Sequence, residues 1–213
     1  MITHLSEALE AMGVELDAAR QARLLDFLAL LKKWNKTYNL TAIHAPERMI
    51  THHLLDSLAI LPHIGASRLL DVGAGAGLPG IPLAIARPDL QVTLIDASHK
   101  KATFMRQAAI ELKLDNVEAL HGRVEDLPAA APWPAIVSRA FSDLNEFVRV
   151  TAHLLAPGGE WLAMKGLYPN EELTQLKGAR LKRDVLLHVP GLEANRHLIV
   201  LERGQPDPFK GAT

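Results

Sequence analysis

The sequence predicts an α/β fold with a seven-stranded, mostly parallel sheet that contains one antiparallel strand. An apolar strand, a glycine-rich turn and an apolar helix follow one another in residues 68–86, which is the opening unit of nucleotide-binding α/β folds. Strand and helix patterns then alternate until two final apolar runs, which are too close in sequence for a parallel crossover. Residues 1–65 show only helical patterns. We therefore expect an N-terminal helical cap over 1–65 and a nucleotide-binding domain over 66–213, packed as one compact unit.

The cap is expected to contain three helices. The first covers 6–12 and ends at Gly13. The second begins after Asp17, a good N-cap residue, and carries a broad apolar stripe from Leu24 to Trp34. The motif Asn39-Leu-Thr-Ala interrupts the helical pattern, and a third helix covers 46–61.

The following domain is expected to alternate between strands and helices. The predicted strands cover 69–72, 91–96, 117–121, 135–139, 159–165, 184–189 and 197–202. The predicted helices cover 78–86, 98–114, 143–155 and 170–178. Pro157-Gly-Gly is expected to form a turn before the fifth strand.

Composition narrows the classes of function. The chain has 213 residues and a net charge of −1, so a globally basic nucleic-acid binder is not indicated and any such binding needs a local patch. It has no cysteine, which excludes disulfides, thiolate metal sites and cysteine nucleophiles. No signal peptide or membrane-length apolar stretch is evident. We expect a cytoplasmic monomer.

The glycine loop indicates which nucleotide is bound. Its glycines are Gly73, Gly75 and Gly77, and the position where a dinucleotide fingerprint has a small residue is Leu78. This favours a ligand without a pyrophosphate, S-adenosylmethionine rather than NAD. Asp71, at the strand end, is expected to accept hydrogen bonds near a ligand ammonium group. The alternative is an ordinary tight turn.

Two further positions support a nucleoside ligand. Asp96 ends the second strand, where a carboxylate can take both ribose hydroxyls; alternatively it caps the helix that follows. After the third strand, Val124 is expected to pack on an adenine, with Glu125 or Asp126 near the edge of the base. The alternative there is a solvated turn.

Two cations end neighbouring strands at the same sheet edge. Arg139 follows an apolar strand and needs a partner, for which we consider Asp71, Asp96, a ligand carboxylate or a phosphate. Lys165 ends the fifth strand. Both are candidates for holding the substrate.

These motifs resemble one family. The segments Asp71-Val-Gly-Ala-Gly-Ala-Gly-Leu-Pro-Gly80, Arg139-Ala140, Lys165-Gly166, Asn39-Leu-Thr41 and His53-Leu-Leu-Asp56 are similar to those of bacterial small-subunit ribosomal RNA methyltransferase G, also known as glucose-inhibited division protein B. The resemblance implies a Rossmann-like class I S-adenosylmethionine-dependent methyltransferase. It also implies methylation at N7 of one guanine of 16S rRNA, guanine 527, on naked rRNA or a small-subunit assembly intermediate. By this resemblance, cofactor contacts fall on Gly73, Leu78, Val124, Glu125 and Arg139.

The implied chemistry needs no general base. Guanine N7 has a free lone pair and no proton, so positioning is expected to carry most of the rate. We assign substrate positioning to Arg139 and Lys165, with Arg123 as a weaker third candidate. Phe141 is expected either to stack on the base or to belong to the core.

The remaining motifs leave alternatives open. Two groups of basic residues are candidates for contacts with RNA or are solvated surface: Lys32, Lys33, Lys36, Lys100, Lys101 and Arg106, and Lys177, Arg180, Lys182 and Arg183. His52 and Asp56 have helical spacing, but two ligands make a weak metal site, so we expect no metal and expect His53 and Asp56 to tie the cap to the sheet. Other possible functions are a small-molecule methyltransferase, a non-catalytic RNA-binding relative and an NAD-dependent oxidoreductase.

Overall fold

The computed structural model describes residues 2–139 and 141–204, so Ala140 and the last part of the predicted second domain lie outside the described residues. The strands are β1 (Arg68–Val72), β2 (Gln91–Asp96), β3 (Val117–His121), β4 (Trp133–Ser138), β5 (Leu155–Lys165), β6 (Ala179–Leu187) and β7 (Arg196–Arg203). The α-helices are α1 (Ile2–Ala11), α2 (Ala18–Tyr38), α3 (Pro46–Met49), α4 (Asp56–Leu58), α5 (Gly80–Ala86), α6 (His99–Glu111), α7 (Leu144–Thr151) and α8 (Asn170–Thr174).

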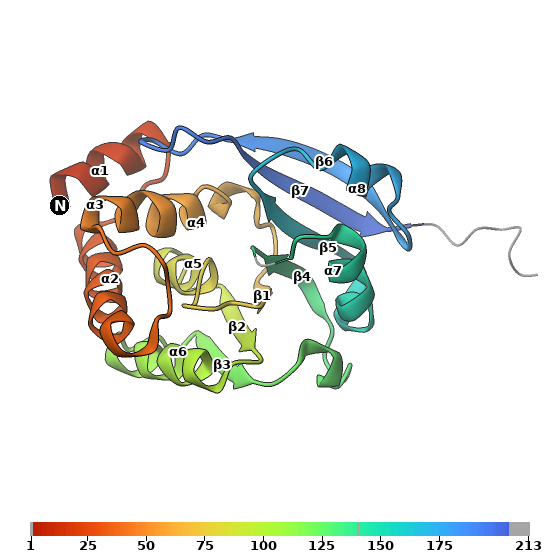
Figure 1. Ribbon diagram of the computed structural model, residues 1–213, viewed down its shortest axis with the longest axis horizontal. Helices are drawn as coiled ribbons and strands as arrows, with labels where there is room; N and C mark the ends of the chain where they lie inside the picture. The colour runs from red at the N-terminus through yellow and green to blue at the C-terminus, as the bar shows by residue number, and fades with distance from the viewer. Residues whose placement is uncertain (1, 140, 205–213) are drawn as a thin grey trace, which may run out of the picture.

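The strands form one sheet in the order β3-β2-β1-β4-β5-β7-β6 (Figure 1). Strands β1 to β5 pair in parallel, whereas β7 is antiparallel to both β5 and β6. The predicted seven-stranded sheet with one antiparallel strand is therefore confirmed. The order reverses at β1, which lies between β2 and β4, and ligands of such sheets bind outside the carboxyl ends of the strands at this switch point.

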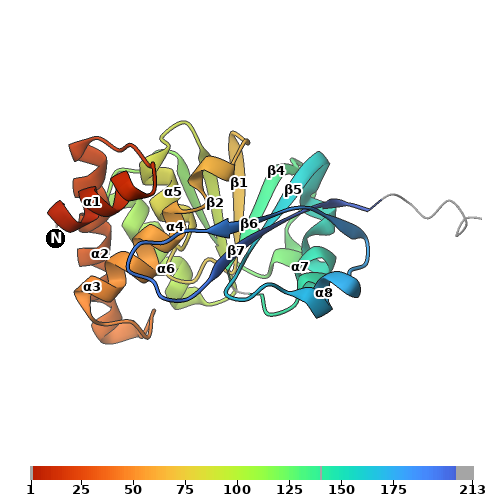
Figure 2. The same cartoon turned by 90° about the horizontal axis from the view of Figure 1, so that it is seen from above.

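Helices cover both faces of the sheet (Figure 2). Successive residues of β1 show the alternation: Leu69 joins the core beneath α2, α5 and α6, and Leu70 joins the core beneath α7. The first core also contains Leu24 and Leu54 of the cap. Because cap and sheet share this buried core, we propose that they fold as one unit, as expected from the sequence.

The cap differs from its predicted form in two helices. Helix α1 begins at Ile2 rather than at residue 6. The predicted helix 46–61 is divided into α3, a π-helical segment Ile50–Leu55, α4 and a final 3₁₀ turn, Leu61–His63. Helix α2 matches its prediction, since the Asp17 carboxylate accepts a 2.7 Å hydrogen bond from the Arg20 N–H and Asn39 ends the helix in the left-handed conformation.

The expected turn at Pro157 is instead a bulge inside β5. Trp133 pairs with Leu155 and Ala135 pairs with Glu160, so β5 has more residues than β4 over this stretch. Gly158, at φ +73°, lies in the bulge. The extra residues are absorbed within the strand, which is why a turn-like sequence does not end it.

Other boundaries differ by a few residues. Helix α5 begins at Gly80, two residues after the predicted start, and α6 ends at Glu111 rather than 114. Helix α8 ends at Thr174, and β6 begins at Ala179, earlier than the predicted strand at 184. The antiparallel pairing predicted for the last two strands is confirmed.

Candidate functional site

The glycine loop joins β1 to α5 and folds back against the end of β2. Gly73, Gly75 and Gly77 have φ values of +68°, +59° and +77°, a backbone conformation that residues with a Cβ rarely adopt. The N–H groups of Gly73 and Ala74 donate to the Ile95 carbonyl at 2.9 and 3.2 Å. The glycines thus let the backbone turn sharply and leave it without side chains at the carboxyl ends of the strands.

Asp71 lies beneath this loop, and its expected hydrogen bonds near a ligand ammonium group stay a prediction. Its side chain is fully buried, and its Oδ2 accepts a 2.8 Å hydrogen bond from the Gly80 N–H at the start of α5. Burial raises the pKa of Asp71 to about 7, against the opposing effects of the Gly80 N–H and the Arg139 cation. Asp71 therefore supports the loop through Gly80, and it is not among the residues that line the three pockets described next.

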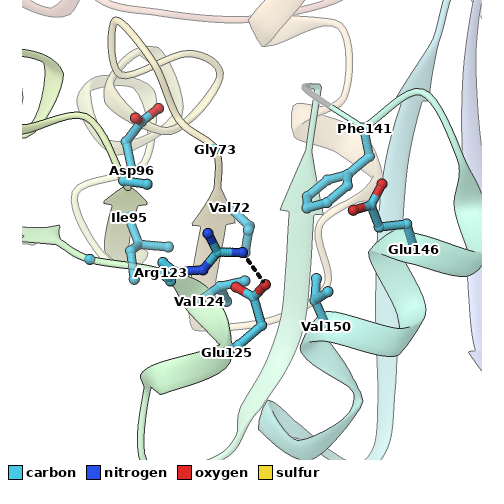
Figure 3. A pocket seen from close by; sticks show the side chains of 12 residues that line it. Val72, Gly73, Ile95, Asp96, Arg123, Val124, Glu125, Phe141, Glu146 and Val150 are labelled. Atoms are coloured by element: carbon cyan, nitrogen blue, oxygen red, sulfur yellow. Dashed lines mark hydrogen bonds and ion pairs between the residues drawn. The ribbon is translucent and has the colours of Figure 1, made fainter.

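Three pockets lie along the carboxyl edge of the sheet. The first pocket, about 270 Å³, is lined by Val72, Gly73, Ile95, Asp96, Ala97, Gly122, Arg123, Val124, Glu125, Phe141, Glu146 and Val150 (Figure 3). The loop pocket, about 200 Å³, is lined by Leu40, Thr41, His53, Gly73, Ala74, Gly75, Ala76, Leu78 and Arg139. The cap pocket, about 430 Å³, is lined by Thr41, Ala42, Ile43, His52, His53, Asp56, Arg139, Met164, Lys165, Gly166 and Arg196.

The three pockets form a row because neighbours share residues. Gly73 lines both the first pocket and the loop pocket, and Arg139 with His53 lines both the loop pocket and the cap pocket. Gly77 lines none of them; a Cβ at Gly77 would lie 2.3 Å from Cδ1 of Ile81, so this glycine allows α5 to pack. The first pocket and the loop pocket together offer space for an elongated ligand, and the cap pocket offers space for a second molecule at the end of that ligand.

Asp96 lines the first pocket, and its expected hydrogen bonds to ribose hydroxyls stay a prediction; the N-cap of α6 is Ser98, so the alternative that Asp96 caps this helix is wrong. Its Oδ2 accepts a 2.9 Å hydrogen bond from the Gly75 N–H, and its Oδ1 accepts one of 2.8 Å from the Ser98 N–H at the start of α6. The Lys101 ammonium lies 3.7 Å away. The carboxylate therefore joins the glycine loop to α6 while still lining the pocket.

Val124, Glu125 and Arg123 also line the first pocket, where they lie between Ile95 and Val150 (Figure 3). Arg123 and Glu125 form a 3.0 Å ion pair, and the backbone N–H of Glu125 together with this guanidinium lowers the pKa of Glu125. Arg123 thus belongs to the first pocket and is not grouped with Arg139 and Lys165. Phe141 lines the same pocket and stacks on Phe147, with ring centroids 5.2 Å apart.

The partner of Arg139 is a residue of the cap. Its guanidinium donates to Asp56 Oδ2 and to the His52 carbonyl, each at 3.1 Å. The expected partners Asp71 and Asp96 are wrong, because Asp71 is enclosed beneath the loop and Asp96 is bonded to backbone N–H groups. The expectation that Asp56 ties the cap to the sheet is confirmed. His53 packs in the same region, where its Nε2 lies 3.0 Å from Thr41 Oγ1.

Sequence reasoning missed Arg196. Its Nε donates to Asp56 Oδ1 at 2.9 Å, so Asp56, which is only 4% exposed, bridges two guanidinium groups. Arg196 begins β7, and because β7 is antiparallel its first residue lies beside the last residues of the parallel strands. Combining the predicted antiparallel strand with the sheet edge of the site would have placed this residue.

Lys165 lines the cap pocket, but its ammonium group is already well bonded. It donates to the carbonyls of Phe141 and Ser142 at 3.3 and 2.9 Å and forms an ion pair of 2.8 Å with Glu172. The structure brings Lys165 together with Arg139 in the cap pocket. Its main contacts, however, hold the segment after β4 against α8.

The histidine and basic groups have defined places. Burial, followed by the Arg139 charge, lowers the pKa of His53 to about 4. His52 Nδ1 lies 3.1 Å from the Arg48 carbonyl, and among the described residues no three His, Asp or Glu side chains gather as a metal site. In the second basic group, Arg180 pairs with Glu202, while Lys182 and Arg183 pair with Glu160.

None of the helices in the described ranges is long and apolar enough to cross a membrane.

The architecture is that of class I S-adenosylmethionine-dependent methyltransferases. Among solved structures, the chain is similar to the O-methyltransferase TomG from Streptomyces achromogenes in complex with SAM, with 19% identity and a TM-score of 0.57 over 93% of this chain and 96% of that one. It is also similar to the glycopeptide N-methyltransferase MtfA, with 13% identity and a TM-score of 0.61 over 75% of this chain and 100% of that one. At these identities the likeness concerns the fold alone.

Sequence comparison identifies the family. The family model described as rRNA small subunit methyltransferase G matches residues 20–199. Two relatives named ribosomal RNA small subunit methyltransferase G are similar over nearly their whole length: the protein of Methylobacillus flagellatus is 54% identical, covering 94% of this chain and 98% of that one, and that of Nitrosospira multiformis is 50% identical, covering 94% and 97%. The chain belongs to the rRNA small subunit methyltransferase G family, as the resemblance of its motifs predicted.

Proposed function

We propose that the protein transfers the methyl group of S-adenosylmethionine to N7 of a guanine of 16S rRNA, guanine 527 by family resemblance. One observation carries the proposal: the three pockets form a continuous row at the switch point of the sheet, in a chain of this rRNA methyltransferase family. The sulfonium of the cofactor supplies an electrophilic methyl group when it is bound. The chain's own residues have to hold and align the two reactants.

The first pocket and the loop pocket fit the cofactor. Val124, 6% exposed, offers an apolar surface for the adenine, and Asp96, which lines the same pocket, is proposed to accept hydrogen bonds from the ribose hydroxyls. In the loop pocket, a Cβ at Gly75 would meet only the Gly73 carbonyl at 3.9 Å, so the backbone leaves room for an amino-acid tail. Arg139 lines this pocket and can hold the tail carboxylate. Gly77 is proposed to shape the loop, whereas Leu78, which lines the loop pocket, is proposed to contact the cofactor.

The cap pocket fits an anionic RNA substrate. Its lining includes three cations, Arg139, Lys165 and Arg196, against one carboxylate, Asp56. We propose that Arg139 and Arg196 hold a phosphate or the guanine O6, since guanidinium groups donate well to both. Lys165 is proposed to position the segment after β4, and Arg123 to act on the cofactor side.

The site does not require a proton acceptor. Guanine N7 would attack with its own lone pair and carries no proton, so no side chain of the site would have to accept one. With the pKa of His53 lowered to about 4, the imidazole beside the pocket is neutral at pH 7. We therefore expect the rate to depend on alignment by Arg139 and its partners and to change little between pH 8 and 9, where Asp71 beneath the loop is already ionised.

The assay uses the methyl-labelled cofactor with 16S rRNA and with small ribosomal subunits that lack the modification, followed by mapping of the labelled nucleotide. We expect label at one guanine N7 and a loss of at least about 100-fold in kcat/KM for Arg139→Ala. Arg183→Ala is the matched control, because Arg183 is an exposed arginine of β6 that pairs with Glu160 outside the pockets. Labelling of small metabolites but no RNA, with cofactor bound, would refute the proposal.

A further inference from the structure

The end of the α2–α6 helix pair next to the pockets forms an exposed surface that the site itself does not use. Trp34, in the last part of α2, contacts the ring of Phe104 in α6, with centroids 5.7 Å apart. Helix α2 ends at Tyr38, and Leu40 and Thr41, just beyond it, line the loop pocket. Helix α6 starts two residues after Ala97, which lines the first pocket. The surface is thus continuous with the row of pockets.

Tyr38 presents an aromatic ring at this end of the pair. Its side chain is 41% exposed and stacks on Trp34, with centroids 5.2 Å apart and ring planes inclined by 29°. Trp34 in turn rests on the buried Phe104. The Tyr38 ring is therefore held in a fixed orientation by a column of aromatic rings while part of it remains open to solvent.

The same region concentrates positive charge in a chain that is nearly neutral. Residues 27–46 contain three lysines and no Asp or Glu, and residues 97–110 contain two lysines and one arginine and no Asp or Glu. Lys33, Lys36 and Lys100 are exposed. This contrasts with the second basic group on β6, where Arg180, Lys182 and Arg183 pair with Glu202 and Glu160.

We propose that the C-terminal end of α2 and the start of α6 bind the single-stranded RNA that flanks the methylated guanine, with Tyr38 on one side of α2, Lys33 and Lys36 around the helix from it, and Lys100 on α6. In this arrangement Tyr38 stacks on an unpaired base, and the lysines contact the adjoining phosphates. A fixed aromatic ring together with exposed lysines on the same pair of helices is the combination by which proteins hold single strands. The inference rests on the proposed function, because it takes the nucleotide in the cap pocket as the start of the bound segment.

The test measures RNA affinity, cofactor affinity and methyl transfer for the full-length protein. In Tyr38→Leu, which keeps an apolar side chain on Trp34 but removes the ring, we expect the Kd for 16S rRNA to rise roughly ten-fold. KM for RNA should rise in parallel, with kcat and the calorimetric affinity for S-adenosylmethionine within two-fold of wild type, roughly the scatter expected for a remote surface change. Tyr38→Phe should bind RNA like wild type, because the ring is retained.

The lysines are tested by salt dependence. The double variant Lys36→Gln/Lys100→Gln should reduce the slope of log Kd for RNA against log salt by roughly 1.4, or about 0.7 for each lost single-strand contact. The control Arg180→Gln/Lys182→Gln should leave this slope unchanged, because those cations are paired.

Several results would overturn the proposal. These are wild-type RNA affinity in Tyr38→Leu, loss of cofactor affinity together with RNA affinity in that variant, or a larger salt effect in the β6 control. Weaker binding to small subunits with unchanged binding to naked rRNA would mean that the surface meets a ribosomal protein. Failure of the proposed function is separable: wild-type protein would then bind RNA without labelling it.

Discussion

At the scale of single residues, the most unusual group is the Asp71 carboxyl beneath the glycine loop. It is fully buried, its Oδ1 has no hydrogen-bond partner among the described residues, and its pKa is raised to about 7. A buried carboxylate without a cation in contact is costly, so the proton is retained up to neutral pH. The loop therefore rests on a group that changes charge near physiological pH.

This titration has a definite sign. The folded state keeps the Asp71 proton up to about pH 7, whereas the unfolded chain loses it near 3.8, so the free energy of unfolding falls as pH rises between these values, by up to roughly 4 kcal/mol. His53 acts in the opposite direction. Its pKa falls from 6.5 to about 4, so its contribution is present above pH 6.5 and is lost as pH falls toward 4.

We expect the pH dependence of stability that His53 causes to become visible in Asp71→Asn, because the opposing titration of Asp71 is then removed. The wild-type protein should show a small net change in the free energy of unfolding between pH 4 and 6.5 and a decrease from 6.5 to 7. In Asp71→Asn the free energy should instead rise by roughly 3 kcal/mol from pH 4 to 6.5 and then stay level. Denaturant unfolding at a series of pH values measures both curves, and parallel curves would contradict the assignment.

At the scale of elements, the start of α5 depends on the absence of a side chain at Gly80. A Cβ there would lie 2.2 Å from Leu94 Cδ2 and 2.9 Å from Asp71 Oδ2. Gly80→Ala should therefore destabilise the protein by about 1–3 kcal/mol and weaken cofactor binding by displacing the loop. Gly65→Ala is the control, because its Cβ would meet no atom within 4 Å. Thermal unfolding measures the stability of the two variants, and calorimetry measures their affinity for S-adenosylmethionine. Equal stability and equal affinity in both variants would contradict the prediction.

The contact between cap and sheet depends on Asp56. Removing its charge leaves Arg139 and Arg196 facing each other without a shared carboxylate. Asp56→Asn should lower the free energy of unfolding by about 2–3 kcal/mol, less than for a fully buried pair because both arginines are partly exposed. The rate of methyl transfer should also fall at a temperature where the variant is still fully folded, so that the loss cannot be due to unfolding. Denaturant titration and initial rates give both values. Wild-type turnover in the folded variant would show that Asp56 does not orient Arg139.

Local patterns account for what the sequence could predict. The glycine loop, Asp96 and the alternation of strands follow from short motifs, and β2 and β3 match their predicted bounds. The π-helical segment Ile50–Leu55 and the bulge in β5 could not be predicted, because both depend on packing against distant elements. The two ion pairs of Asp56 were missed for the same reason: Arg139 and Arg196 are 83 and 140 residues away from Asp56 in sequence.

At the scale of the whole molecule, the chain combines a net charge of −1 with a local concentration of cations around the pockets. Near-neutral composition therefore does not argue against an RNA substrate. The row of pockets also draws on both the cap and the sheet, from Leu40 to Arg196. A ligand that fills the row should stabilise both parts together.

We expect S-adenosylmethionine to raise the unfolding temperature of the whole chain in one transition. At a concentration 100 times its Kd, a ligand of the folded state adds about 2.7 kcal/mol, which corresponds to roughly 5–10 °C for a chain of this size. Differential scanning calorimetry measures the shift. NADH is the control and should leave the transition unchanged. A separate transition for the cap, unaffected by the cofactor, would contradict the single folding unit.

The position of β7 in the sheet has a consequence for the timing of synthesis. This last strand of the described chain is an interior one, inserted between β5 and β6, and it brings Arg196 to Asp56. Strand β6 has no partner other than β7 in the described sheet, so it cannot join until β7 has emerged from the ribosome. Domains fold as units during translation. The cap pocket is therefore completed only after β7 has been synthesised and has paired, and a growing chain that lacks Arg196 carries an unfinished site.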